Sequence, residues 1–179
     1  RRAPMPLLVA SDLESGTSFR LVGGTPTQPN MAVGAAGREA DAFALGRMTA
    51  LEGRAVGIHL AFAPVADVNE NPDNPVINIR SFGEDPQAVS RLVAAAVRGL
   101  ESHGMAATPK HFPGHGNTDI DTHLALPSLA ADWPHLARVE LPPFRAAIAA
   151  GATGVMSAHI ALPGLDGGQV RPATLTPGI

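Results

Sequence analysis

The sequence predicts an α/β fold built on parallel strands, either a doubly wound sheet or a barrel. Short apolar runs alternate along the chain with longer segments of helical periodicity, the rhythm of strand, loop and helix units. Polar residues follow most of these runs directly, and active sites gather at the carboxyl ends of parallel strands in both architectures. The 19 glycines and 17 prolines are spread over the 179 residues and indicate many turns.

Four apolar runs are expected to form buried parallel strands, because each is short and nearly continuous. They are residues 5–10, 58–65, 105–108 and 153–157. A complete (β/α)8 barrel typically needs about 250 residues. With four strand candidates, the sequence therefore predicts either a smaller α/β domain or part of a barrel.

Three helices are expected, at about residues 38–56, 86–103 and 142–150, and a glycine follows each of them as a typical stop. Asp85 and Pro86 supply an N-cap and a first-turn proline for the second helix. Residues 172–179 also have a helix-forming composition. The remaining segments, 15–34, 69–85 and 109–127, are rich in turn-forming or polar residues and are expected to be loops.

Composition excludes several classes of function. The formal net charge is only −3 and no basic patch is present, which argues against a nucleic-acid partner. No apolar run reaches about 18 residues, so we expect no membrane insertion. Cysteine is absent, which excludes disulfides and thiolate metal sites. No glycine-rich phosphate loop follows a strand, so nucleotide binding of that kind is not expected.

The densest polar segment is residues 110–123, which holds a lysine, three histidines and two aspartates. One interpretation is a solvated loop, and a second is a metal site at His111 and His115. Their spacing suits a metal only on a helix, which Pro113 breaks. A third is acid–base catalysis, in which the carboxylate of Asp121 orients the imidazole of His123 two residues later.

This segment, KHFPGHGNTDIDTH, closely resembles the signature of family 3 glycoside hydrolases in their β-N-acetylglucosaminidase branch. The signature reads K-H-[FG]-[PG]-G-[HT]-G, four further residues, then D-x-H, and every fixed position is filled. Asp12, Glu14 and Arg20 resemble the family's D-x-E…R segment. Residues 74–86, NPVINIRSFGEDP, are similar to its N-P-V-I-x-x-R-S-F-G-x-D-P segment. The resemblance covers almost the whole chain in the right order.

The resemblance implies roles for individual residues. His123 would be the general acid/base and Asp121 its partner, with no cofactor and no metal ion. The substrate would be a saccharide that contains N-acetylglucosamine, whose hydroxyls suit a carboxylate facing cationic side chains. The implied sugar-binding residues are Asp12, Arg20, Arg80, Lys110 and His111.

The resemblance also implies a (β/α)8 TIM-barrel fold, here a partial barrel with about four strands. Residues 1–179 would form the family's N-terminal catalytic domain, truncated at both ends, because the first apolar run matches the second barrel strand. The nucleophilic Asp would lie beyond Ile179, since Asp166 does not match its motif. The missing barrel half, or a second chain, would have to cover the exposed strand edges.

The expected activity is that of a retaining β-N-acetylglucosaminidase that removes terminal N-acetylglucosamine, in bacterial cell-wall turnover. Three alternatives stay open. The protein could be an N-acetylglucosaminide phosphorylase, since some family members use phosphate as the acceptor. These residues alone could be a non-catalytic sugar-binding fragment. A metal-dependent barrel hydrolase would lose its activity with a chelator, whereas the glycosidase would not.

Overall fold

In the computed structural model, which describes residues 5–119, 125–177 and 179, short strands pair in parallel in two small sheets. The first contains β1 (Ala10–Ser11), β2 (Leu60–Ala61) and β3 (Ala106–Ala107), in that order. The second contains β4 (Lys110–Phe112) and β5 (Met156–Ser157). The predicted α/β class with parallel strands is confirmed, but the described strands do not close into a barrel.

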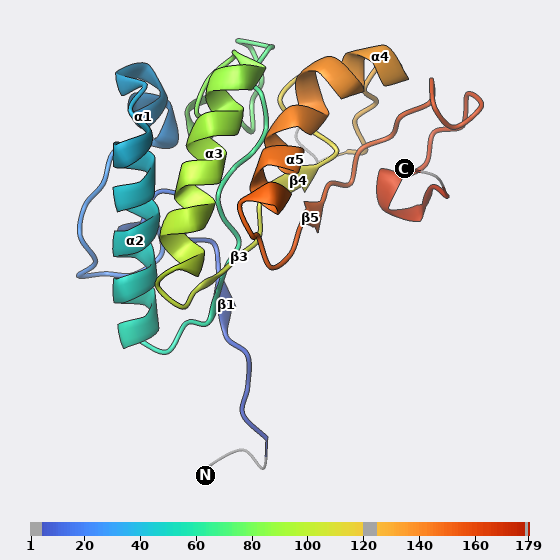
Figure 1. The fold of residues 1–179 in the computed structure, drawn as a ribbon. Coiled ribbons are helices and arrows are strands. Elements are labelled where there is room, and N and C mark those ends of the chain that lie inside the picture. Colours follow the sequence, from blue (N-terminus) through green and yellow to red (C-terminus); the bar gives the residue numbers. More distant parts are fainter. Residues whose placement is uncertain (1–4, 120–124, 178) are drawn as a thin grey trace.

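Helices α2 (Glu39–Ala55), α3 (Pro86–Glu101) and α5 (Leu141–Ala149) lie side by side in front of the strands (Figure 1). All three match predicted helices to within a few residues, except that the chain before α5 is also helical, as described below. The main apolar core forms between these helices and the strands, with α3 at its centre. Among the described residues, no helix combines the length and apolar character that a membrane span requires.

The central helix α3 follows from its sequence. The Asp85 side chain accepts hydrogen bonds from the backbone N–H groups of Gln87 and Ala88, at 3.0 and 3.3 Å, and Pro86 occupies the first turn. Beyond this cap, apolar residues recur at helical spacing and point into the core. The buried apolar residues of α3 are Val89, Leu92, Val93, Ala95, Ala96, Val97 and Leu100.

The contact between α2 and α3 depends on two glycines that face each other. A Cβ atom at Gly46 would collide with the carbonyl oxygen of Ala96, and one at Gly99 would collide with that of Phe43. The two helix backbones therefore approach more closely than any larger side chain would allow. This close contact fixes the helical layer in front of the strands.

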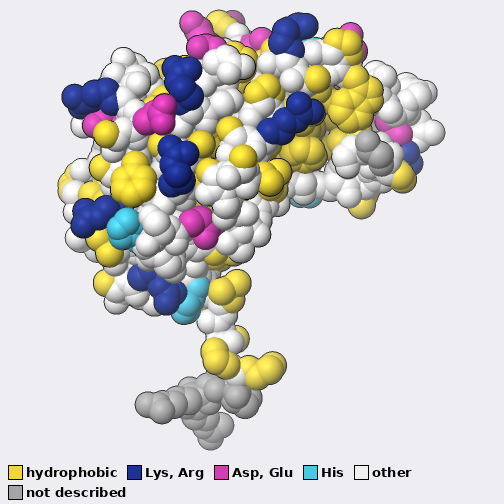
Figure 2. Space-filling model, in the orientation of Figure 1, with side chains coloured by type: hydrophobic (Ala, Val, Ile, Leu, Met, Phe, Trp, Pro, Cys, Tyr) yellow, Lys and Arg dark blue, Asp and Glu magenta, His cyan; other side chains and the backbone are white. Residues whose placement is uncertain are grey.

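The first predicted strand is largely wrong. Only Ala10 and Ser11 pair in a sheet, and residues 5–9 protrude from the body of the protein (Figure 1). Figure 2 shows hydrophobic side chains on this protruding segment. Met5, Leu7 and Leu8 are 75%, 72% and 71% exposed, because no other part of the described chain covers them. An apolar run predicts burial only where the chain supplies a partner surface.

Two predicted loops contain regular structure. Residues 15–34 include most of α1 (Asn30–Ala36), a short helix that ends at Gly37 with a φ of 67°. Its alanines and methionine favour a helix, which the neighbouring Gly and Pro residues obscured. The predicted loop 109–127 begins with strand β4, which was missed because its Lys and His side chains are polar. This strand contributes directly to the candidate site.

The predicted helix at residues 142–150 begins earlier than expected. Helix α4 (Trp133–His135) leads into a π-helical turn (Leu136–Glu140) and then into α5. Prolines 134, 142 and 143 lie in the first turns of α4 and α5, where proline is tolerated. The helix expected at residues 172–179 is only a short 3-10 turn (Ala173–Leu175).

Candidate active site

A cavity of about 520 Å³, lined by several charged side chains, lies at the carboxyl ends of β1 and β2 and along β4. All of the predicted sugar-binding residues lie on its wall, although they come from distant parts of the sequence. The predicted acid/base pair, Asp121 and His123, lies outside the described residues. The predicted residues that line the cavity are Asp12, Arg20, Arg80, Lys110 and His111.

A buried lysine links two carboxylates on one wall of the cavity. Nζ of Lys110 lies 2.7 Å from Oδ1 of Asp12 and 2.6 Å from Oε1 of Glu14. The lysine side chain is only 2% exposed, so both ion pairs are poorly screened by water. Asp12 is more open, at 37%, and can present its second oxygen to a ligand.

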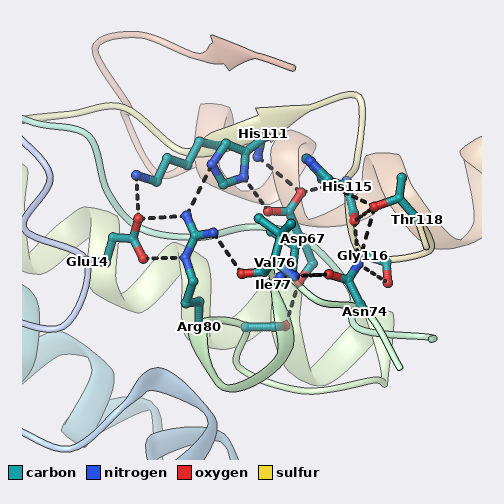
Figure 3. Close-up of polar contacts among 12 residues, drawn as sticks. Glu14, Asp67, Asn74, Val76, Ile77, Arg80, His111, His115, Gly116 and Thr118 are labelled. Carbon is teal, nitrogen blue, oxygen red and sulfur yellow. Dashed lines mark hydrogen bonds and ion pairs between the residues drawn. The ribbon is translucent and has the colours of Figure 1, made fainter. Parts of the chain in front are cut away.

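Glu14 continues this network to Arg80. The guanidinium donates from Nε and Nη2 to the two oxygens of Glu14, at 2.8 Å each, in a bidentate pair (Figure 3). Nη1 of Arg80 also donates to the backbone oxygen of Val76, at 2.9 Å. Burial alone would raise the pKa of Glu14, but its contacts with Arg80 and Lys110 outweigh burial and lower the pKa to about 2. Glu14 is therefore ionised at every pH near neutrality.

The lowered pKa of Glu14 predicts a specific loss of stability in acid. Because its pKa is about 2 in the folded state and about 4.5 when unfolded, its stabilising effect is complete above pH 4.5. The effect is lost as the pH falls from 4.5 through 2, and amounts to roughly 3 kcal/mol. Urea unfolding between pH 2 and 6 should show the wild type approaching the stability of Glu14→Gln as the pH falls. Parallel stability curves for the two proteins would contradict this assignment.

Asp67 holds two histidines of the motif, His111 and His115, in place. Its fully buried carboxylate accepts from the backbone N–H of His111 at 3.1 Å and from that of His115 at 2.8 Å. The other oxygen lies 2.7 Å from Nδ1 of His111 (Figure 3). Nη2 of Arg80 lies 3.4 Å from Nε2 of the same ring, and a guanidinium can only donate. His111 thus donates from Nδ1 to Asp67 and accepts at Nε2.

His115 is the most enclosed of the described histidines in this motif. Burial lowers its pKa, which favours the neutral ring. Its Nδ1 lies 2.7 Å from the Thr118 hydroxyl. His111 lies in strand β4 and His115 in the loop after it. The two residues are therefore not on a helix, which their spacing would require for a shared metal ion.

Asn74 ties the NPVINIR segment to the loop after β4. Its side-chain nitrogen donates to the backbone oxygens of His115 and Gly116, at 2.8 and 3.1 Å. Its side-chain oxygen accepts from the backbone N–H groups of Val76 and Ile77, at 2.8 and 2.7 Å (Figure 3). One buried amide thus satisfies four backbone groups and holds two segments of the site together.

The open side of the cavity is less constrained. The Arg20 side chain is 53% exposed, and its guanidinium lies 3.7 Å from Asp12 and 4.7 Å from the centre of the Phe19 ring. Ser157 and His159, which lie at the end of β5, line the same cavity. These residues can contact a ligand without first breaking a buried ion pair.

Three residues of the site were missed as functional residues by the sequence analysis: Glu14, Asp67 and Asn74. Glu14 and Asp67 come shortly after β1 and β2, which was the available signal for both. Asn74 opens the family-like NPVINIR segment but carries no reactive group. Asp166, the other carboxylate considered, forms a bidentate pair with Arg171 at 2.5 and 2.6 Å and does not line the cavity.

Parallel strands with carboxylates and cations gathered at their carboxyl ends define an α/β protein built to hold a small polar ligand. Comparison with known proteins makes this class specific. A profile of the glycosyl hydrolase family 3 N terminal domain matches residues 1–179. The chain belongs to this family of glycoside hydrolases, as its sequence motifs indicated.

Individual relatives agree with this membership. The chain is 38% identical to β-hexosaminidase A of Pseudoalteromonas piscicida over 98% of this chain and 32% of that protein. A family 3 β-N-acetylglucosaminidase from Paenibacillus sp. str. FPU-7 superposes with a TM-score of 0.90 and 47% identity, over 96% of this chain and 32% of that one.

Two further solved structures bear on ligands. NagZ from Neisseria gonorrhoeae in complex with N-trifluoroacetyl-D-glucosamine has a TM-score of 0.84 and 36% identity, over 93% of this chain and 50% of that one. The β-glucoside phosphorylase BglX has a TM-score of 0.88 and 32% identity, over 97% of this chain and 33% of that one. The chain thus spans between about a third and a half of these proteins.

Proposed function

We propose that the protein containing this chain is a retaining β-N-acetylglucosaminidase that removes terminal N-acetylglucosamine from saccharides. The main support is that the residues implied by the family resemblance converge on one cavity. Asp12 and Arg20 lie on its open side, while Arg80, Lys110 and His111 form its buried wall. A sugar hydroxyl both donates and accepts, so alternating carboxylates and cations suit it.

In the proposed mechanism, His123 protonates the oxygen of the leaving group while an aspartate attacks the anomeric carbon. The aspartate is proposed to lie outside these 179 residues. Asp121 orients the imidazole of His123 and stabilises its cationic form. Neutral His123 then takes a proton from water, which attacks the glycosyl-enzyme and releases the sugar with retention of configuration.

We also propose that the described strands form part of a (β/α)8 barrel. The protruding residues 5–9 and an apolar hollow of about 180 Å³ beside α5 would then face the rest of the barrel. In Figure 2, hydrophobic side chains gather over α4 and α5, where this hollow lies. Bacterial cell-wall fragments are the substrates that we favour, because their N-acetylglucosamine residues match the proposed specificity.

The activity is tested by release of p-nitrophenol from its β-N-acetylglucosaminide by the full-length protein. The proposal expects release, and much weaker release from the matching β-glucoside. A parallel assay with inorganic phosphate addresses the phosphorylase alternative, which the similarity to BglX favours. Formation of N-acetylglucosamine 1-phosphate would identify the protein as a phosphorylase rather than a hydrolase. No release with either acceptor would refute the proposed activity.

Removing Arg80 should mainly weaken substrate binding. The residue lines the cavity, and charge-assisted hydrogen bonds contribute about 1.5–3 kcal/mol each. We therefore expect Arg80→Ala to raise KM by roughly 10- to 100-fold, with a smaller change in kcat. Arg91→Ala is the matched control, because Arg91 is exposed and its one ion pair, with Glu39, is long at 3.9 Å. An unchanged KM in Arg80→Ala would remove this residue from the binding site.

A further inference from the structure

A buried carboxyl group outside the sugar cavity has no explanation in the proposed function. The Glu140 side chain is fully buried, and neither of its oxygens has a hydrogen-bond partner among the described residues. Gly114 lies directly against it, since a Cβ atom at that position would collide with the carboxyl group. A buried carboxyl without partners costs free energy that native proteins avoid, unless a proton or a cation satisfies it.

Two further ligand-type side chains point to the same spot. Nε2 of His135 lies 3.2 Å from Oε2 of Glu70 and 3.9 Å from Oε1 of Glu140. One ligand atom from each of the three residues lies within 4.8 Å of both others. None of the three lines the sugar cavity. His135 also lines an open recess beside Asp132 and Arg138, which gives the cluster access from solvent.

The local backbone produces this cluster. Asp132 caps α4 by accepting from the backbone N–H of His135 at 2.8 Å. In an α-helix, two residues five positions apart point in directions about 140° apart. The π-helical turn between His135 and Glu140 has wider turns, so it brings the two side chains closer to one side. Such π-turns often occur at functional sites.

We propose that Glu70, His135 and Glu140 form a binding site for a divalent transition-metal ion, with Zn²⁺ as its best probe. Two carboxylates and one neutral imidazole balance a charge of +2, and the imidazole disfavours Mg²⁺ and Ca²⁺. With metal–ligand distances of about 2.0–2.2 Å, ligand atoms lie roughly 3–3.5 Å apart. The observed spacing requires only a small inward movement, and water would complete the coordination.

The electrostatics of the pocket support a cation. Glu140 is buried close to two other carboxylates, Asp67 and Glu70, whose negative charges oppose its ionisation. A positive ion between Glu70 and Glu140 would offset the repulsion between the two carboxylates. In the described part of the chain, no lysine or arginine forms an ion pair with Glu140.

The ion would also hold in place the loop after β4, which leads to the proposed acid/base residues. Gly114 packs on Glu140, and the side-chain nitrogen of Asn117 lies 3.4 Å from Oε2 of Glu70. Both belong to the segment that leads to Asp121 and His123. An ion held by Glu70, His135 and Glu140 would therefore fasten this segment to α4, as a structural site rather than a participant in the reaction.

The test is zinc binding by the full-length protein, measured by isothermal titration calorimetry with ZnCl₂ after treatment with EDTA and desalting. The proposal expects a site in the wild type that weakens by at least about 100-fold in His135→Ala and in Glu140→Gln. Glu84→Gln, the same substitution at an exposed position, should bind zinc like the wild type. Zinc should also raise the Tm of the wild type but not of His135→Ala.

Equal zinc binding in the wild type, His135→Ala and Glu70→Gln would overturn the proposal, as would the absence of binding in the wild type. Glu70 and His135 are partly exposed, so these two variants keep the test decisive if Glu140→Gln does not fold. X-ray absorption of the zinc complex should show one imidazole with oxygen ligands. No substrate enters these measurements, so failure of the zinc site leaves the proposed glycosidase activity untouched.

Discussion

Replacing His123 by alanine should slow the cleavage of N-acetylglucosaminides with poor leaving groups by about 10²- to 10⁴-fold, the usual contribution of a general acid. An alkoxide leaving group must be protonated as the glycosidic bond breaks, whereas a dinitrophenolate departs unaided. The variant should therefore retain the rate of glycosylation for the dinitrophenyl substrate. This contrast distinguishes a lost proton donor from a disturbed structure.

The measurement is kcat/KM for a disaccharide and for the 2,4-dinitrophenyl β-N-acetylglucosaminide, in wild type and His123→Ala. His103→Ala is a matched control, because His103 packs edge-on against Phe43 and does not line the cavity. An equal loss on both substrates would exclude His123 as the acid/base. A normal rate on the disaccharide would exclude it as well.

Replacing Lys110 by methionine should weaken substrate binding and lower the free energy of unfolding. The change keeps the length of the side chain but leaves Asp12 and Glu14 facing each other without the cation between them. Removing one partner from a buried ion pair typically costs about 3–5 kcal/mol. Lys110 also helps to lower the pKa of Glu14, so that pKa should rise in the variant.

Urea unfolding and KM together test this prediction. Arg91→Met removes an exposed cation and should cost at most about 1 kcal/mol. The double variant Lys110→Met/Glu14→Gln should regain part of the lost stability, because one uncompensated charge is gone. It should not regain substrate binding. If Lys110→Met is as stable as Arg91→Met, the buried network is not what holds this wall of the cavity.

The sequence predicted most of what its local patterns encode. Helix α3 carries an N-cap and a periodic apolar face, and both α2 and α3 form close to where they were expected. The family resemblance implied that the motif residues share one ligand site, and parallel strands, which bring their carboxyl ends together, explain how these residues meet. Glu14 and Asp67 follow the same rule, yet no local pattern marks a carboxylate as buried or says which group it pairs with.

The failed predictions depend on partners that a local pattern does not contain. The apolar residues 5–9 read as a buried strand, but burial requires a covering surface. Strand β4 was not predicted because Lys110 and His111 are polar. Their side chains can lie at the base of the cavity because Glu14 and Asp67 pair with them. The helical turns before α5, from Trp133 to Glu140, were not predicted at all.

The buried carboxylate of Asp67 has a consequence for engineering the specificity of this protein. It fixes the His111 ring and the backbone of His115 at once, so these two residues form a single unit. A substitution at position 111 would therefore disturb the loop as well as the ligand. Arg20 is exposed and holds no buried group in place. A library aimed at new sugar substituents should therefore vary Arg20 and its exposed neighbours, and leave Asp67, His111 and His115 unchanged.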